Sequence, residues 1–281
     1  MLDFRYHALS LVAVFLALGI GILLGTTIGD QLVSEANRDL SSSLRQDVVE
    51  ARRTARGASD ALEDRERFIA SSFDRIAGDR LRGRSVALVS AGGELPEEVE
   101  NGVRDAVQDA GGELSGVAEF APPTTLPQLG EAIPRRFDGL LQGDPRTAAL
   151  GRAIGRELAG GGVVPRRLAD RFPERFRGEF PRVDAVVYFR DPASDPAEDQ
   201  ERFEQGLVDG LGAGGEPVVG VETLETDPSQ IGFYEDRMPA SVDNVDTPSG
   251  RIALVLGLAG ARGSFGFKSS ADAPLPEPRG R

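Results

Sequence analysis

The pattern of apolar and polar positions divides the chain into an apolar N-terminal stretch, a helical middle and a mixed C-terminal part. Residues Leu9 to Ile28 read LSLVAVFLALGIGILLGTTI and contain no charged residue. Twenty helical residues span about 30 Å, which is the thickness of the hydrocarbon core of a bilayer. A secretory signal would have a shorter apolar core followed by a small-residue cleavage site. The pattern therefore predicts an uncleaved transmembrane anchor over residues 9–28, after a short N-terminal segment of residues 1–8.

The two flanks of this stretch carry different charges. Arg5 and the α-amino group precede it, whereas Asp30 and Glu35 follow it. Because positive residues favour the cytoplasmic side, we expect a single-pass protein of the cell membrane with a cytoplasmic N-terminus and an extracytoplasmic body. Tyr6 and His7 lie at the boundary, where amphipathic rings anchor a helix in the membrane interface. A single histidine without a second ligand makes a poor metal site.

Glycines recur every four residues in the predicted membrane helix. Gly21, Gly25 and Gly29 form two overlapping G-x-x-x-G motifs. Such a stripe lets two helix backbones approach closely and would support pairing in the membrane. Glycine is also common in membrane spans, so the alternative that these residues make no contact stays open.

Apolar residues continue at helical spacing from residue 31 to about residue 76, without a proline. The proposed seam is Val33, Leu40, Leu44, Leu62 and Ile69. Residues 30–84 contain 11 acidic residues and 11 arginines, a balance typical of an exposed, paired helix. A lone helix with so narrow a stripe buries little surface, so we expect a coiled-coil stalk over residues 29–80 that forms a parallel homodimer. The alternative is a single helix packed against the domain that follows.

Short apolar runs alternate with helical patterns after Arg84. We expect strands at residues 85–90, 113–120, 183–189 and 217–223, and helices near 96–110, 146–159, 196–211 and 248–259. This alternation predicts an α/β domain over residues 84–262, with helices on both faces of a mostly parallel sheet in three layers. Residues 263–281 are rich in Gly, Ser and Pro and are predicted to form a flexible tail.

Composition removes several kinds of chemistry. The 281 residues include no cysteine and one histidine, and the formal net charge is −13. A thiol nucleophile, a disulfide framework, a Ser-His-Asp triad and the zinc hydrolases are thereby excluded. The acidic balance disfavours nucleic acid as a partner. We expect a protein that is not an enzyme and holds no cofactor, although paired carboxylates of the glycosidase type stay open because acidic residues are plentiful.

Two polar loops follow predicted strands. Residues 91–96 (AGGELP) stand where a dinucleotide fold has its phosphate loop, but they lack G-x-G-x-x-G and acidic residues follow them. The densest carboxylate group comprises Asp191, Asp195, Glu198, Asp199 and Glu201. Oxygen ligands suit a hard cation, but the spacing matches no calcium loop. We expect instead that Asp195 caps the following helix, with the other acids at its positive end.

Three segments carry a resemblance to a known family. The first is the N-terminal core F-R-Y-H-x-x-S-x-V-A-V-F-L-A-L, which begins with Phe4, Arg5, Tyr6 and His7. The others are Val242–Arg251 (VDNVDTPSGR) and Gly263–Gly266 (GSFG), which leads to Leu275-Pro276. Together they resemble the copper transporter MctB family of actinobacterial envelopes, and the similarity spans most of the chain.

The resemblance implies a role in copper homeostasis or transport, as an outer-membrane or pore-forming protein. It also implies a link to cell separation, in which anchored members pair with a second membrane protein that controls peptidoglycan hydrolases. Copper(I) prefers Cys or Met sulfur and copper(II) prefers imidazole, yet the expected extracytoplasmic part offers only Met238. We therefore expect an indirect effect on copper, with a dimeric coiled-coil scaffold for a cell-wall partner as the alternative.

Overall fold

The computed structural model describes residues 4–120, 129, 146–192 and 198–277, with side chains described for residues 6–25 and from Leu44 onward. The chain divides into two compact units, Met1–Asp64 and Arg65–Arg281. The first unit consists of helix α1, which runs from Phe4 to Ser71 and so extends into the second unit. A short helix, α2 (Phe73–Ile76), follows it.

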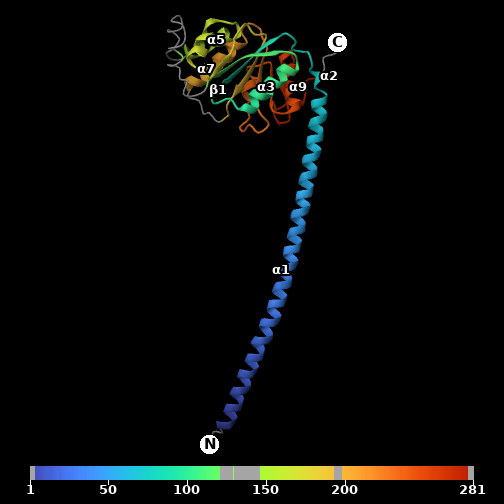
Figure 1. Ribbon diagram of the computed structural model, residues 1–281. Coiled ribbons are helices and arrows are strands. Elements are labelled where there is room, and N and C mark those ends of the chain that lie inside the picture. The colour runs from blue at the N-terminus through green and yellow to red at the C-terminus, as the bar shows by residue number, and fades with distance from the viewer. Residues whose placement is uncertain (1–3, 121–128, 130–145, 193–197, 278–281) are drawn as a thin grey trace. The chain divides into compact units, whose positions relative to one another are not determined.

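The second unit is built on a seven-stranded sheet in the part of the chain that the structure describes (Figure 1). The strands are β1 (Ser85–Ala91), β2 (Glu113–Phe120), β3 (Phe176–Gly178), β4 (Ala185–Arg190), β5 (Val218–Val221), β6 (Ala240–Val242) and β7 (Gly263–Phe265). Their order is β3-β2-β1-β4-β5-β6-β7. All neighbours are parallel except β3, which pairs antiparallel with β2. The prediction of a mostly parallel sheet is therefore confirmed.

Helices cover both faces of this sheet (Figure 1). They are α3 (Glu97–Asp109), α5 (Arg146–Ala159), α6 (Val163–Arg171), α7 (Glu198–Leu211), α8 (Ile231–Glu235) and α9 (Pro248–Leu258). Because side chains alternate along a strand, β1 turns Ala87 and Val89 to the core under α5 and α7, and Val86 and Leu88 to the core under α3 and α9. Two hydrophobic cores result, one on each face.

Helices α5 and α7 pack with their backbones in direct contact. Each carries a G-x-x-x-G pair, Gly151 with Gly155 and Gly206 with Gly210. A Cβ atom added at Gly151 would lie 2.1 Å from a backbone oxygen of α7, and one added at Gly206 would lie 2.0 Å from a backbone oxygen of α5. The glycines therefore set the separation of the two helices, which no larger residue would permit.

The structure confirms the long predicted elements and adds shorter ones. The predicted strands correspond to β1, β2, β4 and β5, and the predicted helices to α3, α5, α7 and α9. The pattern missed α6, α8, β3, β6 and β7. The expectation of a flexible tail from Gly263 is wrong for its first part, because Gly263–Phe265 forms strand β7 and Phe265 is buried at the sheet edge. The content of glycine, serine and proline does not reveal that this segment pairs with the sheet and buries Phe265.

Candidate functional sites: the apolar helix and the buried polar cluster

The N-terminal helix is long and apolar enough to cross a membrane. The qualifying stretch is Tyr6–Gly25, which has 20 residues, a mean hydropathy of 2.6 and no burial against the rest of the protein. Tyr6 is 79% exposed at its start. The boundary motif is only partly described, since the side chains of Phe4 and Arg5 lie outside the described residues. This helix fits a membrane anchor.

The glycine stripe and the stalk seam of helix α1 are both predicted to pair with a second helix. Except for Ile69, their described residues are not covered by other parts of this chain. Added Cβ atoms at Gly21 and Gly25 would meet nothing within 4 Å, so this face is free, whereas Gly29 lies outside the described side chains. On the predicted stalk, Leu44 is 55% exposed and Leu62 is 56% exposed.

The ends of the predicted stalk seam differ from its middle. Val33 and Leu40 lie outside the described side chains. Ile69 packs against the core of the second unit. Of the seam residues with described side chains, Leu44 and Leu62 are therefore exposed, whereas Ile69 belongs to the folded domain.

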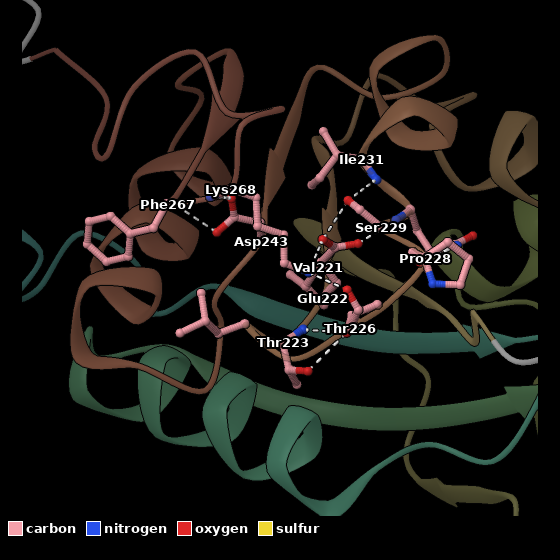
Figure 2. Close-up of polar contacts among 12 residues, drawn as sticks. Val221, Glu222, Thr223, Thr226, Pro228, Ser229, Ile231, Asp243, Phe267 and Lys268 are labelled. Atoms are coloured by element: carbon pink, nitrogen blue, oxygen red, sulfur yellow. Dashed lines mark hydrogen bonds and ion pairs between the residues drawn. The ribbon is translucent and has the colours of Figure 1, made fainter. Parts of the chain in front are cut away.

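A buried carboxylate stands at the carboxyl end of β5 (Figure 2). Glu222 has no exposed surface. Its Oε1 accepts hydrogen bonds from Ser229 Oγ at 2.8 Å and from Lys268 Nζ at 2.7 Å, and its Oε2 accepts from the backbone N–H of Gln230 at 2.5 Å. Lys268 Nζ also donates to the backbone oxygen of Thr226 at 2.7 Å. The only lysine of the chain thus forms a largely buried ion pair with Glu222.

A second buried carboxylate, at the end of β6, holds the same C-terminal segment. Asp243 accepts backbone hydrogen bonds from Phe267 at 3.0 Å and from Lys268 at 2.7 Å (Figure 2). Gly266 has a φ of 143°, and a Cβ atom there would lie 1.8 Å from Asp243 Oδ1, so only glycine fits. The two C-terminal segments that carry the family resemblance therefore meet at this contact.

The polar cluster continues to β4 through Gln230. Arg190 donates from Nη1 to Gln230 Oε1 at 2.6 Å and from Nε to Glu204 Oε2 at 3.0 Å. Burial raises the pKa of Glu204, and the hydrogen bond and charge of Arg190 act against this rise. Tyr234 donates to the backbone oxygen of Val221 at 3.0 Å, and burial raises its pKa. We use the name carboxyl-edge cluster for a set of seven residues: Arg190, Glu204, Glu222, Gln230, Tyr234, Asp243 and Lys268.

The hydrogen bonds of the carboxyl-edge cluster are made within the protein and join the ends of neighbouring strands. Both oxygens of Glu222 accept hydrogen bonds from within the protein, and Lys268 Nζ is used by Glu222 and Thr226. Satisfied buried pairs of this kind hold elements together, whereas a catalytic group needs access to substrate. The cluster ties the ends of β4 to β7 together.

The carboxylates singled out from the sequence are described only in part. Among the described residues, no group of three or more His, Cys, Asp or Glu side chains could hold a metal ion. Glu198, Asp199 and Glu201 lie in the first turn of α7, as expected for acids at a helix N-terminus. Asp195, the predicted cap, lies outside the described residues.

Sequence reasoning missed Glu222, Asp243 and Lys268 as a group. Two signals could have found it. Lys268 is the sole lysine among 32 basic residues, and Glu222 and Asp243 each directly follow a short apolar run. Polar residues just after parallel strands meet at one edge of the sheet.

The fold and these sites define a mixed α/β protein with one N-terminal helix able to span a membrane. The profile of a family described as "Copper transport outer membrane protein, MctB" matches residues 1–167 and 177–276. The chain belongs to this family. A comparison with curated proteins gave no match.

Proposed function

We propose that this chain is a non-enzymatic, single-pass membrane-anchored protein of the cell envelope that affects copper homeostasis indirectly. The family match supports a copper-related envelope role, and the 20-residue apolar helix supports the anchor. In this proposal the N-terminus is cytoplasmic and the α/β domain is extracytoplasmic. A reporter that is active only outside the cytoplasm should be active when it is fused after Arg281, and a reporter that is active only in the cytoplasm should not. A mature N-terminus found near residue 30 would contradict the uncleaved anchor.

The burial of Met238 supports the proposal that the effect on copper is indirect. Met238 is the only sulfur ligand after Met1, and it is 7% exposed within the core under α5 and α7. His7, the only imidazole, stands at the start of the apolar helix. Copper as cargo would be left with carboxylate and amide oxygens, which are poor ligands for copper(I).

Copper titration of the full chain in detergent tests this proposal. We expect no site tighter than micromolar for copper(I) or copper(II), and a Met238→Leu variant should titrate like the wild type. A stoichiometric nanomolar site would overturn the indirect role. If that site also survived in His7→Gln, the remaining candidate ligands would be carboxylate and amide oxygens.

A second candidate function is a dimeric scaffold that positions a cell-wall or membrane partner in cell separation. The exposed stripe of Leu44, Val48 and Leu62 favours it, because residues at coiled-coil spacing are stabilised by a second helix. A deletion strain discriminates the two. Copper sensitivity with normal division supports the first function, and chains of unseparated cells with normal copper tolerance support the second.

A further inference from the structure

A hollow of about 820 Å³ opens at the edge of the sheet opposite the carboxyl-edge cluster. Its lining includes Pro217 and Val218, where β5 begins, and Pro239, just before β6. It also includes Leu258, the last residue of α9, and residues 259–262, between α9 and β7. This volume lies within the range of small-molecule sites, roughly 300–1,000 Å³.

The lining of this hollow carries an excess of positive charge. Four arginines line it, Arg84, Arg152, Arg237 and Arg262, together with Asp209 and Glu216. Asp209 has an arginine partner within the hollow, whereas Glu216 is paired only through Oε1, and its Oε2 is buried without a hydrogen-bond partner among the described residues. Asp209 pairs with Arg152 at 2.7 Å, and Glu216 pairs at 3.4 Å with an arginine outside the hollow, Arg182.

The guanidinium groups of Arg84 and Arg262 have N–H donors that are not used by described residues. Arg84 donates from Nη1 to the backbone oxygen of Leu258 at 3.2 Å, which uses one of its five N–H groups. For Arg262 the structure gives no hydrogen bond or ion pair with any described residue, and its side chain is exposed. Neither has a carboxylate partner among the described residues. This is notable because residues 85–281 contain 33 acidic and 20 basic residues.

Apolar residues also border the hollow. Val208, Val218 and Leu258 line it, although their side chains are almost entirely buried in the two cores. Apolar residues combined with a few polar groups are the usual lining of a small-molecule site. Guanidinium groups recognise carboxylate and phosphate groups in the same planar, two-point manner.

We propose that this hollow binds a small organic anion, with its carboxylate or phosphate groups held by Arg84 and Arg262 and its body over Val208 and Val218. Ligands of open α/β sheets normally bind at the carboxyl ends of the strands. In this domain the carboxyl ends of β4 to β7 are filled by Glu222, Lys268 and their partners, whereas the opposite edge holds open space. The site is independent of the proposed role in copper homeostasis.

Calorimetric titration of the full chain in detergent at low salt tests the site. Citrate is the carboxylate probe and pyrophosphate is the phosphate probe. We expect one saturable site for at least one of them, and the preferred probe identifies the chemistry. Arg262→Glu should weaken binding by about tenfold or more, because it replaces a charge-assisted donor with a repelling charge. Arg84→Gln should weaken it as well.

Arg167→Glu is the matched control. Arg167 is exposed on α6, outside the hollow, and the same change in net charge there should leave affinity within about twofold, since distant exposed charges are screened. Thermal unfolding of Arg262→Glu should match the wild type because Arg262 is exposed and makes no hydrogen bond or ion pair with a described residue. The proposal is overturned if neither probe saturates, if Arg262→Glu binds as well as the wild type, or if Arg167→Glu loses as much affinity.

Discussion

Replacing Lys268 by Met would test whether the carboxyl-edge cluster fastens the C-terminal segment to the sheet. Methionine keeps most of the apolar stem and removes the ammonium group. Glu222 would then stand as a buried carboxylate with no exposed surface and only its bonds from Ser229 and Gln230. Removing one partner of a buried ion pair costs about 3–5 kcal/mol. Because Glu222 keeps two hydrogen bonds, we expect the lower end, about 3 kcal/mol.

The assay is urea unfolding of the full chain in detergent, followed by near-ultraviolet circular dichroism. Two of the three tyrosines, Tyr188 and Tyr234, are buried in the domain, whereas the third, Tyr6, is 79% exposed on helix α1, and the chain has no tryptophan. The change in this signal on unfolding therefore comes mainly from the domain. About 3 kcal/mol corresponds to a fall in Tm of roughly 6–12 °C for a domain of this size.

A double-mutant cycle separates the ion pair from other effects. Glu222→Gln in the Lys268→Met background removes the uncompensated charge and should recover part of the lost stability. Arg82→Gln is the control, since its ion pair with Asp79 is exposed and its loss should not be measurable. A cost of Lys268→Met below about 1 kcal/mol, or additive effects of the two changes, would refute the reasoning.

Three further changes test other parts of the structure. Gly206→Ala should destabilise the domain by about 1–3 kcal/mol or more in the same urea assay, because its Cβ would strike the backbone of α5, whereas Gly232→Ala, with nothing within 4 Å, should be neutral. Burial raises the pKa of Glu204 above 4.5, so the folded state keeps this proton where the unfolded chain has lost it. Stability should therefore fall as the pH rises above about 4.5, and Glu204→Gln should remove that part of the slope. Changing Leu44 and Leu62 together to Asp should abolish self-association in sedimentation experiments while leaving the domain folded; a wild type that is already monomeric at tens of micromolar would contradict the dimer.

The long elements of the domain were predictable because each carries a full pattern. Strand β1 and helix α5 have seven and 14 residues, enough for a buried run or several helical turns to stand out. Strands β6 and β7 have three residues each, too few for any period. They are held in place by tertiary contacts, such as the 3.0 Å hydrogen bond between Ser241 Oγ and Ser264 Oγ.

The cluster was less predictable than the fold because its members are distant in sequence. Lys268 and Glu222 are separated by 46 residues, and no spacing rule relates them. Only the order of the strands brings the ends of β5, β6 and β7 together. The amino-acid pattern reveals the polar residues at these ends but not the strand order that makes them neighbours.

The ordered C-terminal segment shows how specific contacts override composition. Glycine, serine and proline lower the apolar content of residues 263–281, which argues for disorder. Phe265 is nevertheless buried, and two consecutive N–H groups after it bind the carboxylate of Asp243. Hydrogen bonds to a buried charge are worth more than neutral ones, about 1.5–3 kcal/mol each. Lys268 adds a largely buried ion pair with Glu222 in the same segment, and Gly266 supplies the only backbone that fits against Asp243. These contacts act against the ordering entropy that composition alone would leave unopposed.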